Sequence, residues 1–333
     1  PDRHGEFFSQ NAVLMHRRLA VVDIEKGNQP MTYAVDGAVF TLCYNGELYN
    51  TNEIRNTLES RGYNFFSHSD TEVVLKAYVE YREKCVDMFN GIFAFAVWEH
   101  ETRRLFVARD RMGVKPLFYS MTKSGFVFAS EIKALLEHSE IEPVIDTRSL
   151  AEIMIIGPGR TPGCGVFKGI SEIRPAHYAY YDETGLTIHR YWNVEAHEHS
   201  DSFEQTAEKV RYLVTDSIKR QLVSDVPLCT FLSGGLDSSL ISSVTNGEFN
   251  KRGEVLHTFS VDYKDNEKYF KKSKFQPNSD PEFIRIMEKY LGGVHHRIVI
   301  DTDELVNALY CAVDARDLPG MADVDASMLL LCK

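Results

Sequence analysis

The chain has 333 residues, 44% hydrophobic and 26% charged, a composition typical of a globular protein with two domains. The net charge of −11 argues against nucleic acid or an anionic membrane surface as the main partner. No apolar run reaches membrane-span length, and the first thirty residues lack a signal-peptide core. Six scattered cysteines without a C-x-x-C pair indicate a reducing, cytoplasmic environment.

Both ends of the chain look cut. It begins at Pro1 without a methionine and stops at Lys333 inside a predicted helix. We therefore expect a fragment that lacks both ends.

Residues 1–193 contain many short apolar runs typical of strands, with helical periodicity at 48–61 and 71–81. This density of short strands predicts packed antiparallel sheets with helices outside, an α+β domain. The predicted strands are Val13–Met15, Val39–Tyr44, Ile92–Trp98, Arg104–Ala108 and Phe126–Ala129.

Residues 202–333 alternate between helices and strands, after a polar linker at 192–202. Such alternation predicts a doubly wound parallel sheet, an α/β domain. The predicted helices are 202–221, 238–245, 281–291 and 302–313, and the predicted strands are 226–232, 256–261 and 296–300.

The sequence SGGLDSS at 233–239 follows an apolar run and precedes a helix. This order presents free backbone N–H groups to an anion, and glycines let the backbone approach a phosphate closely. The loop is neither a Walker loop, since no lysine follows the glycines, nor a G-x-G-x-x-G fingerprint. It resembles the pyrophosphate loop of enzymes that split ATP between the α and β phosphates, with Asp237 as a candidate Mg²⁺ ligand. The alternative is an ordinary glycine turn with a serine N-cap.

Several stretches precede this loop in a fixed order. They are HRRLAVVD at 16–23, QPM at 29–31, YNGELYN at 44–50, SDTE at 69–72, NGIFAFAVW at 90–98, ARDRMGVKPLFY at 108–119 and ASEIKAL at 129–135. Together with SGGLDSS they resemble the glutamine-hydrolysing asparagine synthetases of bacterial type over nearly the whole chain.

The resemblance implies a glutaminase domain at 1–193, of the N-terminal-nucleophile type with an αββα sandwich, and an asparagine synthase domain at 202–333. It implies that glutamine is hydrolysed in the first domain and that ammonia passes through an internal channel to the second. There ATP would adenylate aspartate, and ammonia would displace AMP to give asparagine. Glutamine, aspartate and ATP are the implied partners, Mg²⁺ the implied metal, and a homodimer the implied assembly.

A glutamine site needs a cation for the α-carboxylate, an anion for the α-ammonium and donors for the oxyanion. Arg18 suits the first role and Asp70, helped by Glu47, the second. Asn45 and Gly46 suit the third, as a side-chain amide and a backbone N–H. By resemblance the glutamine contacts are Arg18, Leu19, Ala20, Val21, Val22, Asn45, Gly46, Glu47 and Asp70.

Each of these residues has a structural alternative. Asn45-Gly46 could turn a type I′ hairpin, Asp70 could cap the helix that follows it, and Arg18 could be a surface charge. Arg109, Asp110, Arg111 and Lys115 are assigned to ion pairs that hold strands together.

The family's nucleophile is a cysteine at the very N-terminus, and none of the six cysteines has that context. Cys43 is predicted to pack in a strand as a small hydrophobe. We expect the polypeptide as printed not to hydrolyse glutamine.

By resemblance, the ATP contacts surround the glycine loop and the end of the next strand. They are Phe231, Leu232, Ser233, Gly234, Gly235, Leu236, Asp237, Ser238, Ser239 and Val261. Asp262 could face metal or substrate, or be a solvated strand end. His295-His296 is assigned to structure, because adjacent strand residues point apart and no third metal ligand is spaced suitably.

Two later stretches are less defined. Residues 263–280 carry five lysines and are either a solvated loop or a lid over the site. The family's second acidic glycine-rich segment and a downstream lysine are absent, and Asp317 and Asp323 are candidates in a stretch that departs from the family form.

Two other functions remain open. A related ligase could amidate another carboxylate, as in β-lactam, antibiotic or cell-envelope biosynthesis. Alternatively, a non-catalytic module could sense glutamine or nucleotide.

Overall fold

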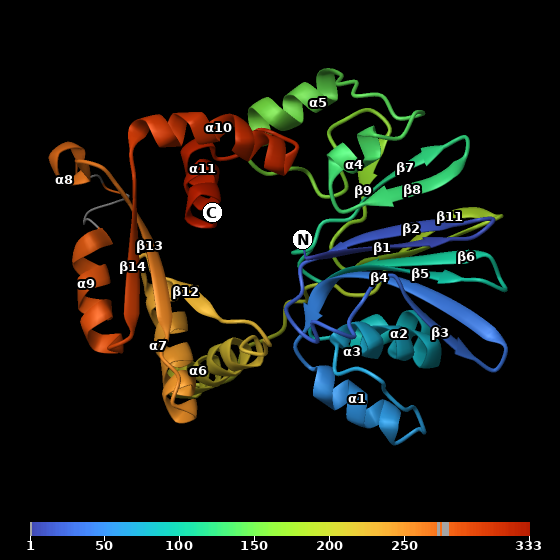
Figure 1. The fold of residues 1–333 in the computed structure, drawn as a ribbon, viewed down its shortest axis with the longest axis horizontal. Helices are drawn as coiled ribbons and strands as arrows, with labels where there is room; N and C mark the ends of the chain where they lie inside the picture. The colour runs from blue at the N-terminus through green and yellow to red at the C-terminus, as the bar shows by residue number, and fades with distance from the viewer. Residues whose placement is uncertain (1, 272–273, 275–279) are drawn as a thin grey trace. The chain divides into compact units, whose positions relative to one another are not determined.

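The computed structural model describes residues 2–271, 274 and 280–333 (Figure 1). The chain folds as two compact units, Pro1–His197 and Glu198–Lys333. Of the predicted loop or lid at 263–280, residues 272–273 and 275–279 lie outside the described residues.

The first unit contains eleven strands and a few short helices among its described residues. Its strands are β1 (Arg3–Phe8), β2 (Val13–Arg18), β3 (Met31–Val35), β4 (Ala38–Leu48), β5 (Gly91–Glu99), β6 (Arg104–Arg109), β7 (Phe118–Thr122), β8 (Gly125–Ala129), β9 (Ile170–Glu172), β10 (His177–Asp182) and β11 (Gly185–Arg190). Its helices are α1 (Thr51–Glu59), α2 (Asp70–Tyr81), η1 (Arg82–Lys84), α3 (Cys85–Met88), α4 (Ile132–Leu136), α5 (Thr147–Ala151) and η2 (Glu152–Ile156).

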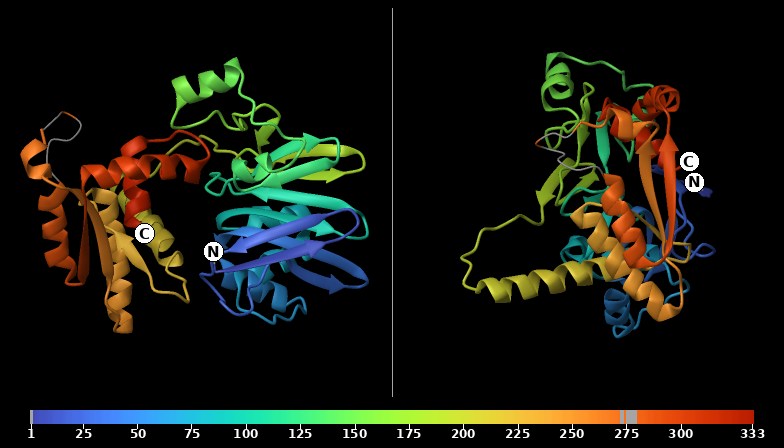
Figure 2. Two further views of the ribbon diagram at one scale, coloured as in Figure 1. Left: turned by 45° about the horizontal axis from the view of Figure 1, so that its top comes forward. Right: turned by 90° about the vertical axis from the view of Figure 1, so that its left-hand side faces the viewer.

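These elements form layers. In the described part of the unit, a six-stranded antiparallel sheet runs in the order β11-β10-β6-β5-β4-β3. Helices α1–α3 cover one face, and the β1-β2 and β8-β7-β9 sheets cover the other, as Figures 1 and 2 show. Helix α4 packs on β7 and β8. The N-terminal-nucleophile αββα sandwich predicted from the sequence is therefore confirmed.

Strand β5 shows why the sheet is buried on both faces. Phe93, Phe95 and Val97 pack toward the helices, while Ala94 and Ala96 join the core on the opposite face. All five side chains are at most 4% exposed. Because successive side chains alternate between faces, an unbroken apolar run is what a sheet covered on both sides requires.

The second unit is built on a parallel sheet. Its described strands are β12 (Cys229–Phe231), β13 (His257–Tyr263) and β14 (Val294–Ile300), in that order. Its helices are α6 (Phe203–Arg220), α7 (Leu236–Arg252), α8 (Asn266–Tyr269), α9 (Asp280–Leu291), α10 (Thr302–Arg316) and α11 (Ala322–Leu331). Helices α9 and α11 lie on opposite sides of the sheet in Figure 1, which gives the predicted α/β layering.

The predicted buried strand at 226–232 is wrong in extent and burial. Strand β12 is only three residues long, and its Phe231 is 48% exposed. It pairs with β13 alone, so it is an edge strand among the described residues. Pro227 has no N–H to donate to a ladder, which fits the late start of the strand. Leu232, just after the strand, is fully buried.

Hydroxyl groups link α7 to the sheet. Ser242 of α7 is fully buried, and its Oγ lies 2.8 Å from Oγ1 of Thr230 in β12. On β13, Thr258 Oγ1 and Ser260 Oγ contact the two ring nitrogens of His295 at 2.8 and 3.0 Å. Since buried polar groups are costly without partners, these pairs fix where helix and strands meet.

No helix among the described residues combines the length and apolar character that crossing a bilayer requires.

Phe106 is the first test of the layered core. Its ring is fully buried and lies 4.8 Å from Tyr78 and 5.1 Å from Tyr180 between ring centres. We predict that Phe106→Ala lowers the free energy of unfolding of the first unit by about 3–5 kcal/mol, because the packing around the lost ring cannot collapse fully.

Chemical denaturation measures this change, and Phe8→Ala is the control. Phe8 is 62% exposed on β1, so its loss should change stability by less than about 0.5 kcal/mol. Equal effects of the two substitutions would contradict the assignment of the core.

Candidate functional site

The first unit has a partly open cavity of about 1770 Å³ between its sheets. Its wall includes eight of the nine residues predicted to contact glutamine, namely Arg18, Leu19, Val21, Val22, Asn45, Gly46, Glu47 and Asp70. The exception is Ala20, which is buried and donates its backbone N–H to Asp2 Oδ2 at 2.9 Å. The fold thus gathers residues that lie more than fifty positions apart in the sequence.

Asn45 and Gly46 lie inside strand β4, opposite Ala94 and Phe93 of β5. The hairpin-turn interpretation is therefore wrong. A Cβ on Gly46 would lie 2.4 Å from the carbonyl oxygen of Ile92, so only glycine fits this close approach of two strands. Within the described residues, the Asn45 side chain makes no hydrogen bond, and its amide is available to a ligand.

Asp70 is the first residue of α2 and is half-buried at the cavity wall. Its Oδ2 accepts hydrogen bonds from Tyr44 Oη at 3.0 Å and from the Leu48 N–H at 3.1 Å. Burial raises the pKa of Asp70, although these donors act in the opposite direction. The N-cap of α2 is Ser69, whose Oγ accepts from Thr71 N–H, so Asp70 is free of the capping role considered from the sequence.

Arg18 is buried, not a surface charge. Its guanidinium donates to the carbonyl oxygens of Val22, Asp23 and Ile24 at 2.7, 2.9 and 3.1 Å. Among the described residues, two of its five N–H groups remain without a hydrogen bond. Arg18 therefore shapes its own loop, and only part of its donor capacity is left for a ligand.

The residues assigned to structure are structural with one exception. Arg109 pairs with Glu172 at 2.9 Å and donates to three carbonyl oxygens, while Asp110 accepts several backbone N–H groups. Arg111 donates to the carbonyl oxygen of Asp87 at 2.9 Å. Lys115 instead lines the cavity. Burial raises the pKa of Glu47, and the charge of Lys115 opposes this.

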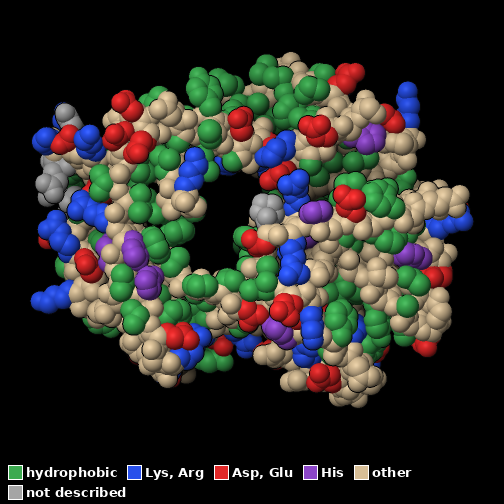
Figure 3. Space-filling view, viewed as in Figure 1, with side chains coloured by type: hydrophobic (Ala, Val, Ile, Leu, Met, Phe, Trp, Pro, Cys, Tyr) green, Lys and Arg blue, Asp and Glu red, His purple; other side chains and the backbone are tan. Residues whose placement is uncertain are grey.

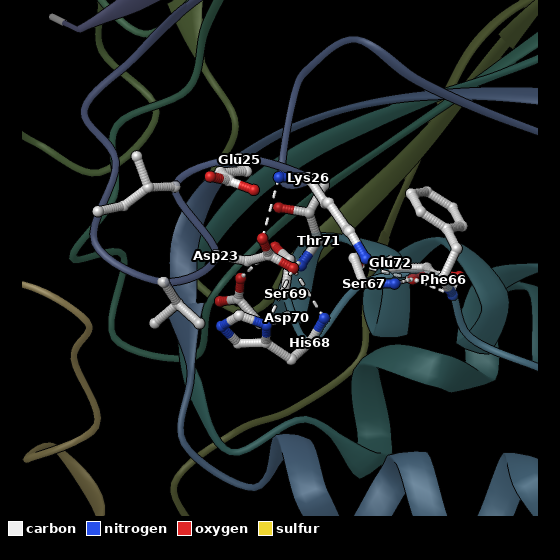
Figure 4. A network of polar contacts seen from close by, with 12 residues as sticks. Asp23, Glu25, Lys26, Phe66, Ser67, His68, Ser69, Asp70, Thr71 and Glu72 are labelled. Atoms are coloured by element: carbon white, nitrogen blue, oxygen red, sulfur yellow. Dashed lines mark hydrogen bonds and ion pairs between the residues drawn. The ribbon is translucent and has the colours of Figure 1, made fainter.

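Sequence reasoning missed two anchors of the cavity wall. The Gln29 side chain accepts from Tyr44 N–H at 2.6 Å and donates to Tyr44 O at 2.9 Å, so it pairs with β4 as a strand residue does. Asp23 binds backbone N–H groups of Lys26 and His68, as Figure 4 shows. Neither had a spacing signal, since their partners are brought close only by the fold.

Cys43 lines the cavity, and among the described residues its thiol makes no hydrogen bond or ion pair. Burial raises the pKa of its thiol to about 12, so the thiolate is scarce at neutral pH. Its side chain belongs to the core between the sheets. The prediction that Cys43 packs as a small hydrophobe is confirmed.

The glycine loop of the second unit joins β12 to α7. Gly234 has φ +77°, and Gly235 is the residue before the first turn of α7. The Oγ of Ser238 lies 3.0 Å from the Oγ of Ser233 and accepts from the Ser233 N–H at 3.3 Å. The backbone N–H groups at the start of α7 have no helical partner and carry partial positive charge, as anion binding requires.

Asp237 lies exposed in the first turn of α7. Among the described residues, no group of three or more potential metal ligands exists. A Mg²⁺ ion held mainly by phosphate oxygens needs only one or two carboxylates, so Asp237 fits this kind of site and no preformed cage.

The remaining predicted residues of the second unit have these positions. Val261 lies half-buried in β13, Phe231 ends β12, and Leu236 is exposed at the start of α7. Asp262 is a buried partner of Arg297 and Asn266, not a solvated strand end.

The two histidines are structural, as predicted. His295 contacts Thr258 and Ser260, and His296 lies 2.9 Å from His257 and stacks on Phe259. Burial is the main reason that the pKa of His295 is lowered.

Asp317 and Asp323 occupy helix ends. Asp317 follows α10 with φ +67°, and Asp323 lies in the first turn of α11. Neither position tests the roles considered from the sequence.

Comparison with known proteins identifies the class of both units. Residues 1–192 match the family model described as "Glutamine amidotransferase domain", and residues 209–333 match "Asparagine synthase". The chain therefore belongs to the glutamine amidotransferase family and carries an asparagine synthase domain after it.

Among individual relatives, the chain is 53% identical over 334 residues to asparagine synthetase (glutamine-hydrolyzing) 3 of Bacillus subtilis (strain 168). The match covers 100% of this chain and 54% of that protein. Asparagine synthetase B of Escherichia coli (strain K12) is 31% identical over 329 residues, which cover 93% of this chain and 50% of that protein. The chain thus spans about half the length of the curated relatives it matches.

A solved structure of glutamine phosphoribosylpyrophosphate amidotransferase from B. subtilis is 16% identical, with a TM-score of 0.41. The matched region covers 86% of this chain and 67% of that enzyme. The similarity between the two folds is therefore weak.

Gly46 allows the geometry of the cavity to be tested. We predict that Gly46→Ala lowers stability by about 1–3 kcal/mol, because the new methyl group pushes β4 from β5. Gly159→Ala is the control, since the nearest atom to its Cβ is 3.9 Å away. Thermal unfolding measures both, and an unchanged melting temperature for Gly46→Ala would contradict the close strand approach.

Proposed function

We propose that the protein makes asparagine from aspartate with glutamine as the nitrogen donor and ATP as the energy source. The observation that carries the proposal is the joining of two sites in one chain. A cavity with the residues for an amino acid lies in an amidotransferase domain, and an anion-binding loop lies in an asparagine synthase domain.

In the first unit, the residues suit a zwitterion. The free N–H groups of Arg18 bind the α-carboxylate of glutamine, and the Asp70 carboxylate binds the α-ammonium. Leu19, Val21 and Val22 line the pocket beside Arg18. The Asn45 amide and the Gly46 N–H stabilise the oxyanion that forms when the amide carbon is attacked. Cys43 is not the nucleophile, because its thiol stays protonated.

In the second unit, the glycine loop holds the phosphates of ATP. Gly234 and the first residues of α7 offer backbone N–H groups, and Ser233, Ser238 and Ser239 offer hydroxyl groups. Phe231, Leu232, Leu236 and Val261 surround the adenosine. Mg²⁺, held by the phosphates and Asp237, would supply charge neutralisation for adenylation of the aspartate carboxylate. Ammonia from the first unit then displaces AMP.

The cysteines and the surface charges bear on where the protein acts and on the kind of partner it binds. We propose a cytoplasmic enzyme, consistent with six cysteines that are all free within the described residues. We also propose that the protein is a homodimer. Acidic and basic side chains are interspersed on the face shown in Figure 3, which favours small-molecule partners over nucleic acid.

The decisive experiment is exchange of labelled pyrophosphate into ATP by the protein. We expect exchange to depend on aspartate, because the acyl adenylate forms reversibly from that acid and ATP. Exchange with a different carboxylic acid and none with aspartate would replace asparagine synthesis by a related amide ligation. Glutamine binding without any exchange would indicate a sensing module instead.

Two glycines at opposite ends of α7 test the ATP loop. Gly234 and Gly253 have φ values of +77° and +71°, so an alanine is strained by about 1–2 kcal/mol at each. A Cβ at Gly234 would also lie 2.9 Å from Phe283 Cβ, whereas a Cβ at Gly253 meets nothing within 4 Å. We predict that Gly234→Ala lowers ATP affinity at least about tenfold and that Gly253→Ala leaves it unchanged.

Calorimetric titration with ATP and Mg²⁺ measures these affinities. Equal affinity of the two variants would remove the glycine loop from the ATP site.

The buried carboxylate predicts how glutamine affinity depends on pH. Only ionised Asp70 attracts an ammonium group, and burial raises its pKa above the usual range of aspartate. Glutamine affinity should therefore fall as pH is lowered from about 8 to about 4, beginning at a higher pH than an unperturbed aspartate would give.

Titration calorimetry with L-glutamine across this pH range provides the measurement. Asp70→Asn should weaken binding at least about 30-fold near neutral pH and remove the pH dependence. Glu59→Gln, at an exposed position of α1, is the control and should retain both. Wild-type affinity in Asp70→Asn would exclude Asp70 from the site.

A further inference from the structure

The loop between β2 and β3, residues 19–30, forms one wall of the glutamine cavity. Leu19, Val21, Val22 and Gln29 line the cavity from this loop. The loop contains neither helix nor strand, so no regular backbone hydrogen bonds fix its position. Side chains must therefore hold it in place, and they decide how accurately the wall is positioned.

Asp23 makes the contacts of such an anchor. Its Oδ1 accepts from Lys26 N–H at 2.9 Å, which folds the loop on itself. Its Oδ2 accepts from His68 N–H at 2.8 Å and lies 3.1 Å from His68 Nδ1. Asp23 is 3% exposed and has φ +50°, a conformation uncommon outside glycine. One carboxylate thus joins two segments 45 residues apart in sequence.

The second segment leads directly to Asp70. His68 is followed by Ser69, the N-cap of α2, and then by Asp70 itself, as Figure 4 shows. On the other side, the carbonyl oxygens of Val22, Asp23 and Ile24 accept hydrogen bonds from the guanidinium of Arg18. Asp23 therefore stands between the two groups that would bind the carboxylate and the ammonium of one amino acid.

The Asp23 carboxylate is charged at neutral pH. Burial, the largest single effect, raises its pKa. The N–H groups of Lys26 and His68 and the nearby His68 ring outweigh burial, so the pKa is lowered overall. A charged acceptor makes stronger hydrogen bonds with backbone N–H groups than a neutral one does.

We propose that Asp23 is a positioning residue of the glutamine site, which fixes the distance between the loop wall with Arg18 and the Asp70 carboxylate. The inference rests on the proposed function. The α-carboxylate and α-ammonium of an amino acid share one carbon, so their two partners must be held at a matching separation. Small displacements of such groups can cost about 100-fold.

The experiment is titration of the protein with L-glutamine. Asp23→Asn keeps the size of the side chain but replaces one acceptor oxygen by an NH₂ group that faces an N–H donor. We expect its Kd for glutamine to rise about 10- to 100-fold. Glu99→Gln is the matched control. Glu99 is also 3% exposed and hydrogen-bonded, to Tyr78, Thr102 and Arg104, but it does not line the cavity.

The control separates positioning from general stability. Glu99→Gln should lower the melting temperature and leave the Kd for glutamine unchanged. In the full-length protein, the ratio of ammonia-dependent to glutamine-dependent asparagine formation gives a second readout. Asp23→Asn should raise the KM for glutamine and leave the ammonia-dependent reaction unchanged, which a merely structural defect would not do.

A milder variant covers the case in which Asp23→Asn does not fold. His68→Ala keeps the backbone N–H and removes the exposed ring contact with Asp23, so a rise in Kd of up to about fivefold is expected. Unchanged Kd in folded Asp23→Asn, or an equal rise in Glu99→Gln, overturns the inference and leaves the proposed function standing. Absence of glutamine binding by the unsubstituted protein overturns both.

Discussion

Strand β4 is the element on which the first site depends. It is hydrogen-bonded to β3 on one side and to β5 on the other, and both faces of its sheet are covered. Asn45, Gly46 and Glu47 belong to β4, and Tyr44 reaches Asp70 from it. Because a one-residue shift would exchange the two faces of the strand, the ladder with β5 decides which of these groups face the cavity.

The two candidate sites would bind their ligands by different physical means. In the first, charged and amide side chains are held in a cavity by buried hydrogen bonds. In the second, the backbone at the start of α7 provides the donors, and Gly234 supplies a conformation that most residues avoid. The first arrangement can distinguish one amino acid from another, whereas the second suits any nucleotide phosphate.

Much of the fold could be predicted from local patterns. The apolar runs at 92–98 and 104–108 became β5 and β6, and the periodicity at 71–81 became α2. Strand β12 was predicted too long, because an apolar run does not reveal that it lies at a sheet edge. Strands β1, β3, β7, β9, β10 and β11 were not predicted. Some of them pair with distant partners, such as β10 with β6 and β9 with β7, that single-sequence patterns cannot show.

The candidate site could be predicted in part for the same reason. Asn45, Gly46 and Asp70 were found through motifs, and the structure places all three at one cavity. The hairpin alternative for Asn45-Gly46 was undone by β5, which pairs across both residues. Asp23 and Gln29 lay within the stretches HRRLAVVD and QPM, but no role was assigned to them, because their partners His68 and Tyr44 are 45 and 15 residues away. Lys115 was assigned to structure since its neighbours are structural.

The hydroxyl pair of Thr230 and Ser242 has a consequence for the glycine loop at the start of α7. A shift of α7 along its axis by one turn, about 5.4 Å, would leave both hydroxyl oxygens buried without hydrogen-bond partners. A purely apolar contact would tolerate such a shift far better, because the hydrophobic effect is not directional. Ser242 in α7 thus fixes the position of the helix along its axis and, with it, how far the first turn of α7 extends past the sheet.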